Sequence, residues 1–220
     1  HTGWNTGSKG RNGNGWTYSY NAHKIRGFKE THQPSPWIND YGQISLMPVR
    51  DASVFEEDGR ASWFSHQSEV AKPWYYRVYL ADHDVNVEIT PTERAALLRF
   101  TFPESETAGV VVDAFDKGSE VTIHPAERRI TGYTTRNSGG VADGFKNYFV
   151  IEFDKPFDVY YAIEDSILHE DRTNIACDHA GAIVTFDTSS GEKVTAHVAS
   201  SFISPEQAMI NLRRDRKSVV

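Results

Sequence analysis

The sequence has a single cysteine, Cys177, among its 220 residues. An intramolecular disulfide is therefore excluded, and the fold must be held together by its core. A lone cysteine more often serves as a small buried apolar residue than as a nucleophile, which is the role we expect for Cys177. One cysteine does not identify the redox compartment.

Positive charge is also in short supply. Lys and Arg total 23 against 30 Asp and Glu, which gives a formal net charge of −7. An acidic balance leaves no electrostatic footprint for nucleic acid or for an anionic membrane surface. No apolar stretch is long enough to span a bilayer. A neutral ligand such as a sugar is compatible with this composition.

The signatures of several enzyme classes are missing. The sequence has no nucleophile elbow G-x-S-x-G, no phosphate-binding glycine loop and no H-E-x-x-H metal motif. His66 and Glu69 lie three residues apart, but this spacing alone does not make such a metal-binding helix. Among thirty acidic residues, the sequence cannot show which two would flank a glycosidic bond. We therefore assign no catalytic residue and no metal ligand within this chain.

Short alternating runs of apolar and polar residues follow residue 60, and a period of two is typical of strands with one buried face. The clearest runs are Trp74–Leu80, Val85–Ile89, Leu98–Phe102, Phe149–Phe153 and Val194–Val198. Turn signals such as Asp58-Gly59, Lys117-Gly118 and Ser190-Gly191 separate the runs. The pattern predicts an all-β, antiparallel sandwich or barrel.

Two local predictions accompany this pattern. In the first run, Trp74, Tyr76, Val78 and Leu80 are expected to share one face of a strand. The segment Gly3–Gly15 is rich in Gly and Asn, which tolerate unusual backbone angles, so we expect it to be loop.

The end of the chain changes character at Ser204. Ser204 can cap a helix, Pro205 suits the first helical position, and Gln207 lies three residues after the cap. Ala208 and Leu212 are one helical turn apart. We predict a sandwich domain over residues 1–203 and, over residues 204–220, the beginning of a linker helix that leads to a further domain.

A proline-stiffened polar segment, Lys29–Gly42, contains the candidate binding residues His32, Trp37 and Asp40. An aromatic ring covers the apolar face of a sugar while carboxylate and imidazole groups bond its hydroxyls. The segment therefore suits substrate binding of a sugar. It suits equally a structural loop in which Trp37 plugs the end of the sandwich and Asp40 caps a turn.

The chain resembles the N-terminal domain of glycoside hydrolase family 92 in four blocks that occur in the family's order. The first block lies in the loop segment, as Gly27-Phe28, Thr31-His32, Asp40-Tyr41-Gly42 and Leu46-Met47-Pro48. The second runs from His66 to Pro103, the third from Ile130 to Phe153 and the fourth from Ser201 to Leu212. Gln33-Pro34-Ser35-Pro36 departs from the Leu-Ser-Gly stretch that many members have after the His.

This resemblance implies a galactose-mutarotase-like supersandwich whose opening strand, before His1, is missing from the sequence. It implies the N-terminal domain of a calcium-dependent, inverting exo-α-mannosidase, a glycosidase that is secreted, periplasmic or on the cell surface. The catalytic residues and calcium ligands are expected in an (α/α)6 barrel outside this chain. This domain would pack on that barrel and contribute His32, Trp37 and Asp40 to one wall of the mannose pocket.

Two other functions stay open. A stand-alone carbohydrate-binding module would use the same Trp37 loop, and a structural accessory domain would stabilise its neighbour without touching sugar. All three exclude nucleic acid and a membrane span. The first reading takes α-mannosides, such as the mannose of N-glycans, and the protein's own C-terminal helical domain as partners, and it predicts that this fragment alone is inactive.

Overall fold

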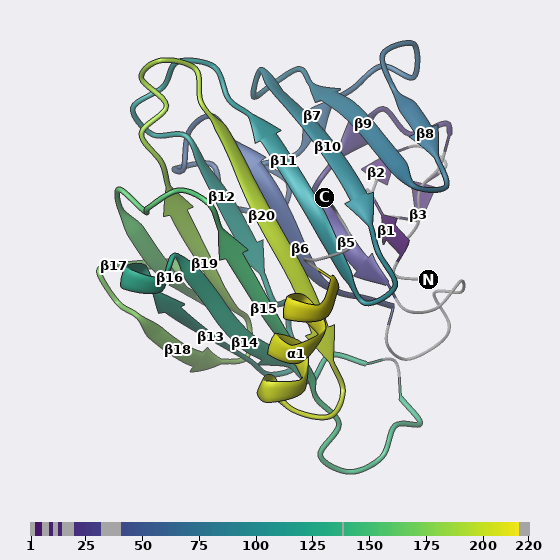
Figure 1. Cartoon of the computed structure of the whole chain (residues 1–220), viewed down its shortest axis with the longest axis vertical. Helices are drawn as coiled ribbons and strands as arrows, with labels where there is room; N and C mark the ends of the chain where they lie inside the picture. Colours follow the sequence, from purple (N-terminus) through teal and green to yellow (C-terminus); the bar gives the residue numbers. More distant parts are fainter. Residues whose placement is uncertain are drawn as a thin grey trace.

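The chain folds as a β-sandwich, described here from a computed structural model that covers residues 3–5, 9–10, 13–14, 20–31, 41–137 and 139–215. Two large antiparallel sheets of seven and nine strands pack face to face (Figure 1). One α-helix lies near the end of the chain, and the remaining helical element among the described residues is a single 3-10 turn, η1 (Pro125–Glu127). The predicted all-β sandwich is thereby confirmed.

Neighbouring strands in both large sheets are antiparallel. Some neighbours are consecutive in the chain, and others are joined by crossover connections. In spatial order the seven-stranded sheet is β1 (Gly3–Asn5), β5 (Phe28–Thr31), β6 (Tyr41–Val49), β12 (Gly109–Asp113), β19 (Ala180–Thr185), β16 (Tyr160–Glu164) and β17 (Ile167–Glu170). The nine-stranded sheet is β18 (Asn174–Cys177), β13 (Ser119–His124), β14 (Arg129–Thr134), β15 (Asn147–Phe153), β20 (Lys193–Ser201), β11 (Ala95–Thr101), β10 (Val85–Pro91), β9 (Tyr75–Leu80) and β8 (Val70–Lys72). Two small sheets pair β2 (Lys9–Gly10) with β3 (Gly13–Asn14) and β4 (Lys24–Ile25) with β7 (Ser62–Trp63).

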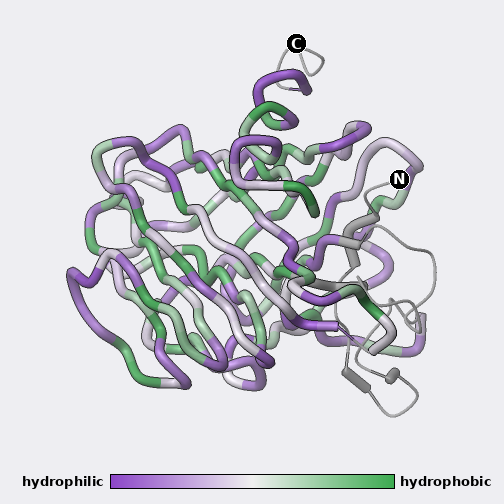
Figure 2. The backbone as a smooth tube through the Cα atoms, turned by 90° about the horizontal axis from the view of Figure 1, so that it is seen from below, coloured by the Kyte–Doolittle hydropathy of each residue, from purple (hydrophilic) through white to green (hydrophobic). Residues whose placement is uncertain are grey.

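The core fills the space between the two sheets. Along β10, Val85, Val87 and Ile89 are buried while the residues between them reach the surface, as the period of two predicts. Hydrophobic and hydrophilic residues alternate along the strands in the same way in Figure 2. Cys177 is half-buried against this core, and burial raises the pKa of its thiol. It behaves as the small apolar residue that we expected.

Two local predictions were wrong. The segment Gly3–Gly15 contains β1, β2 and β3, because β1 adds to the edge of the seven-stranded sheet and β2 and β3 form a hairpin. Trp74 does not share a strand face with Val78 and Leu80. Lys72 pairs with Tyr75, so Trp74 lies in the intervening turn of the β8–β9 hairpin, where 65% of it is exposed.

The predicted helix is confirmed as α1 (Pro205–Asp215), which packs on the outer face of the nine-stranded sheet (Figure 1). The Ser204 hydroxyl accepts a hydrogen bond from the Gln207 amide at 3.2 Å, which is the expected cap. Ala208 and Leu212 bury against a small apolar cluster formed by Ala95, Val150 and Ala199.

The far end of α1 is also attached. Asp215 accepts hydrogen bonds from the Thr92 hydroxyl at 2.6 Å and from the Arg94 amide at 2.7 Å, both in the β10–β11 turn. The helix is therefore fastened to the sandwich along its length. No helix among the described residues has the length and apolar character needed to traverse a bilayer.

Gly132 marks a place where neighbouring strands approach too closely for a side chain. A Cβ at this position of β14 would lie 2.1 Å from the Glu120 carbonyl oxygen and 2.7 Å from the Phe149 ring. Because one of these atoms belongs to the backbone of β13, the strands themselves would have to separate.

We predict that Gly132→Ala destabilises the domain by about 3 kcal/mol, because overpacking of this kind forces backbone shifts. Denaturant unfolding of the purified domain measures the change. Gly59→Ala is the matched control, since its Cβ would meet nothing closer than 3.6 Å. Equal stability of the two variants would contradict the packing argument.

Candidate functional site

The predicted sugar-binding loop joins two neighbouring strands at one end of the sandwich. β5 ends at Thr31 and β6 begins at Tyr41, and these two residues pair across the ladder. His32, Trp37 and Asp40 all lie between them, outside the described residues. Their roles stay predictions, and the backbone pairing of β5 with β6 gives the position of the two strands that flank them.

Other connections meet at the same end, which we call the loop end. β12 finishes there at Asp113, which pairs with Ser45 of β6. Thr134 at the end of β14 pairs with Asn147 at the start of β15. β20 also ends there and leads through Phe202 and Ile203 into α1. Connections of both sheets and the N-terminus of the helix therefore lie at the end of the sandwich where β5 ends and β6 begins.

The interior of the sandwich becomes polar at the loop end. Glu30 on β5 faces the space between the sheets with only 1% of its surface exposed, and its Oε1 accepts a hydrogen bond from the Ser200 hydroxyl at 2.6 Å. Thr134 and Asn147 are fully buried nearby along β14 and β15. Other buried polar residues, such as Ser62, His83, Thr185 and Thr188, lie elsewhere in the domain. Because a buried polar group costs stability unless it is hydrogen-bonded, the bond between Ser200 and Glu30 fixes both side chains in place.

Asn147 is the most exceptional member of this polar layer. Neither its side-chain oxygen nor its side-chain nitrogen has a hydrogen-bond partner among the described residues. A buried amide without partners costs about 1–3 kcal/mol for each unmatched group. The loop end therefore contains a buried donor and a buried acceptor that make no hydrogen bond with the other described residues.

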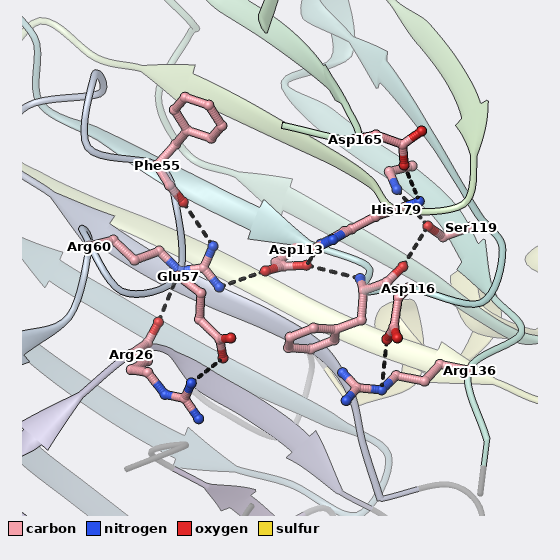
Figure 3. Close-up of polar contacts among 12 residues, drawn as sticks. Arg26, Phe55, Glu57, Arg60, Asp113, Asp116, Ser119, Arg136, Asp165 and His179 are labelled. Atoms are coloured by element: carbon pink, nitrogen blue, oxygen red, sulfur yellow. Dashed lines mark hydrogen bonds and ion pairs between the residues drawn. The ribbon is translucent and has the colours of Figure 1, made fainter. Parts of the chain in front are cut away.

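A buried ion cluster lies on the outer face of the seven-stranded sheet beside the loop end (Figure 3). Arg60 reaches Asp113 Oδ2 at 2.6 Å, and it also donates to the carbonyl oxygens of Arg26 at 3.0 Å and Phe55 at 2.9 Å. His179 Nε2 lies 2.7 Å from Asp113 Oδ1. This arrangement ties β12, the β18–β19 turn and the segment around Arg60 together.

The ionisation of Asp113 reflects these contacts. Burial opposes its charge, but the Arg60 guanidinium and the hydrogen bond with His179 outweigh burial and hold the pKa of the carboxyl well below its usual range. The hydrogen bond to Asp113 in turn raises the pKa of His179, in part offset by burial. Asp113 Oδ1 also accepts the Phe115 amide at 2.9 Å and fixes the turn in which Phe115 has a left-handed backbone, with φ 59.

Lys29 is a second unusual group in this region. Its ammonium lies 4.7 Å from the centre of the Phe115 ring and 3.9 Å from Glu57 Oε1. Burial lowers the pKa of Lys29 to about 8; Glu57 opposes this, and the positive charges of Arg136 and Arg26 add to it. In the folded protein, the charged form of Lys29 is therefore less favourable in free energy than it is in the unfolded chain.

This region could not be found by sequence reasoning. Arg60 and Asp113 are 53 residues apart, and His179 lies a further 66 residues along the chain. The adjacent charges Lys29-Glu30 directly after Phe28 are the one signal present, because two ionisable residues in succession are unusual in a strand whose neighbours are buried. Within the described ranges, no group of three or more His, Cys, Asp or Glu is arranged to hold a metal ion.

We predict that Lys29→Met raises the free energy of unfolding at pH 7 by about 1–3 kcal/mol, because it removes a buried charge whose pKa is depressed. In the parent protein, the lowered pKa means that the unfolded chain binds more protons between about pH 8 and 10.5, so stability rises with pH in that window. The variant should lack this rise.

Denaturant unfolding at pH 7, 8.5 and 10 measures both effects. Lys72→Met on β8 is the control, since Lys72 is exposed and its loss should change stability by less than about 0.5 kcal/mol. A Lys29→Met variant that is less stable than the parent protein at pH 7 would refute the prediction.

Comparison with known proteins places this scaffold in a family. The chain matches the glycosyl hydrolase family 92 N-terminal domain over residues 2–201. Among curated proteins, none matched the chain.

Solved structures agree with this match. An inverting mannosidase of family GH92 from Bacteroides thetaiotaomicron VPI-5482 is 44% identical, with a TM-score of 0.87 over 96% of this chain and 28% of that protein. A family GH92 α-mannosidase from Bacteroides thetaiotaomicron is 26% identical, with a TM-score of 0.81 over 97% of this chain and 31% of that protein. The same α-mannosidase has also been solved in complex with mannoimidazole.

The chain spans less than a third of the length of each of these relatives, with 28% and 31% covered. The similarity extends over both sheets and is not limited to a single motif, because it includes nearly every residue of this chain. The chain therefore belongs to glycosyl hydrolase family 92 and corresponds to the N-terminal domain of that family.

Proposed function

We propose that this chain is the N-terminal domain of a calcium-dependent, inverting exo-α-mannosidase, in which it packs on a helical catalytic domain and forms one wall of the mannose pocket. The observation that supports the proposal is that Thr31 and Tyr41, which flank the 32–40 segment, lie at the same end of the sandwich as the buried Glu30–Ser200 pair and the start of α1. Its support from comparison is that the solved relatives are mannosidases.

An exposed apolar surface accompanies α1. Ile203 is 77% exposed, and Phe202 and Ile210 are each 40% exposed. The Phe202 ring lies 5.5 Å from that of Phe145, which belongs to the connection between β14 and β15. A hollow of ≈ 490 Å³ opens beside these residues, between α1 and the β10–β11 turn. Exposed large apolar side chains beside a hollow are typical of an interaction site, and we assign this one to the catalytic domain.

The chemistry is then divided between two domains. His32, Trp37 and Asp40 hold the sugar, with the Trp37 ring against its apolar face and the polar groups on its hydroxyls. Inversion needs two carboxyl groups about 6.5–9.5 Å apart around a water molecule, and we place both in the catalytic domain. The calcium ligands belong there too, where the ion would orient the sugar hydroxyls. The sandwich binds, orients and excludes water.

The proposed substrates are α-mannosides, including the mannose of N-glycans. The proposed location is secreted, periplasmic or at the cell surface, where such glycans are found.

We predict that the isolated 220-residue chain releases no mannose from α-linked mannobioses with or without calcium, while the protein that also contains the catalytic domain does. In that longer protein, Trp37→Ala should raise KM at least about tenfold, because stacking on the sugar ring is lost. Initial rates at varied substrate concentration measure the effect.

Trp74→Ala is the matched control, since Trp74 is an exposed tryptophan in the β8–β9 turn, and β10 and β11 separate β9 from β20. Turnover by the isolated chain would overturn the division between the domains. An unchanged KM in Trp37→Ala, together with lower stability when the sandwich is deleted, would identify a purely structural accessory domain.

A stand-alone carbohydrate-binding module is the second candidate, and the exposure of Trp63 favours it. Trp63 on β7 is 51% exposed, with the Lys24 ammonium 5.4 Å from its ring centre. Exposed tryptophans are the usual platforms for sugar rings.

Calorimetry of the isolated domain with α-mannosides separates the two candidates. A wall of an incomplete pocket should give no measurable heat at millimolar sugar. A module should bind measurably and lose that binding in Trp37→Ala or Trp63→Ala, with Trp74→Ala as the control.

A further inference from the structure

A continuous series of hydrogen bonds connects α1 to the strand that carries the sugar loop. The Gln207 side-chain amide donates to Asn211 Oδ1 at 3.0 Å, and Asn211 Nδ2 donates to the Ser200 carbonyl oxygen at 2.9 Å. The Ser200 hydroxyl then donates to Glu30 Oε1 at 2.6 Å. Glu30 stands on β5, two residues before His32.

The series extends from the outer face of the nine-stranded sheet to the opposite sheet. α1 lies on the outer face of the nine-stranded sheet, Ser200 belongs to β20 within that sheet, and Glu30 belongs to β5 in the opposite sheet. Glu30 and Ser200 are 170 residues apart in the sequence. Their contact is a polar link between the two sheets beside a large apolar core.

Stability alone does not account for a carboxylate at position 30. Glu30 is 1% exposed, Ser200 is 5% exposed and Asn211 is 8% exposed. Burial of a carboxylate is expensive even when it is hydrogen-bonded, and apolar residues of similar volume are often as stable or more so. Hydrogen bonds between buried groups instead specify one arrangement of the elements that they join. The arrangement specified here is that of α1 relative to the base of the 32–40 loop.

The helix end of the series is well anchored. Ala208 and Leu212 pack on the sheet, and Asp215 is bonded to the β10–β11 turn. Ser200, Gln207 and Asn211 also line the hollow beside α1. A partner that seats against α1 and this hollow would therefore act on residues already bonded to Glu30.

We propose that Glu30, Ser200 and Asn211 are positioning residues that set the sugar-binding loop relative to α1, and hence relative to the catalytic domain docked on it. This inference rests on the proposed function. None of the three residues touches the sugar. They hold the end of β5 so that the wall and the catalytic groups face each other at the correct separation, and small displacements of such a wall weaken binding strongly.

The test uses the protein that contains both domains and measures initial rates on the α-linked mannobiose that it cleaves fastest. Ser200→Ala removes the hydroxyl that Glu30 accepts. KM should rise about tenfold while kcat changes less than about twofold, since the loss falls on binding rather than on the chemical step. Ser200→Thr restores a hydroxyl and should recover most of the affinity.

Ser62→Ala is the matched control. Ser62 of β7 is also buried, but its hydroxyl accepts from the Asp82 amide at 3.0 Å, donates to the Trp63 carbonyl oxygen at 3.2 Å and is not bonded to Glu30. Its KM should equal that of the parent protein. Equal KM values for Ser200→Ala and Ser62→Ala would overturn the proposal, as would a fall in melting temperature with KM unchanged.

A second variant covers the case in which Ser200→Ala does not fold. Asn211→Asp replaces the amide that donates to Ser200 with an oxygen of the same shape, and it should raise KM in the same way. A normal KM in this variant would reject the connection through α1.

Trp37→Ala, measured in the same protein, distinguishes a failure of the proposed function from a failure of the positioning role. If Trp37→Ala leaves KM unchanged, the loop is not a wall of the pocket and the proposed function fails. If Trp37→Ala raises KM while Ser200→Ala and Asn211→Asp do not, the loop binds sugar and only the positioning role is lost.

Discussion

Burial of the apolar faces of two antiparallel sheets against each other is the constraint on which the whole domain depends. With one cysteine there is no disulfide to hold the sheets together, so the core must do so alone. Its members are mainly aliphatic and aromatic side chains from both sheets. Close approach of the strands leaves room for no more than hydrogen at Gly132, because a Cβ there would meet the backbone of the next strand.

Several buried polar groups interrupt this apolar core at or beside the loop end. Glu30 and Asn147 are buried at the loop end, and the Arg60–Asp113 pair lies beside it on the outer face of the seven-stranded sheet. Each buried charge costs stability unless hydrogen bonds or an opposite charge compensate for its burial, as Arg60 does for Asp113.

Sequence patterns predicted the structure correctly where the environment of a residue depends on its neighbours along the chain. The alternation in β10 gave the correct buried residues, and Ser204 gave the correct helix cap. The alternation pattern failed at Trp74. It assigned Trp74 to the strand, but the tight turn of the β8–β9 hairpin contains this residue. Sequence patterns also failed over Gly3–Gly15, because an edge strand such as β1 is defined by the partner it pairs with and not by its own composition. The resemblance to family 92 was confirmed, whereas the roles of His32, Trp37 and Asp40 stay predictions.

The sequence by itself determined the fold class, the family and the beginning of α1, because periodicity, turn residues and caps act over a few positions and are written in consecutive residues. Only the tertiary structure decided that Glu30 meets Ser200, that Asp113 meets both Arg60 and His179, and that Asn211 of α1 is bonded to β20. The contacts of Glu30 and of Asp113 join residues 53 to 170 positions apart. Their formation requires two sheets to pack in one particular register, and no local pattern carries that information.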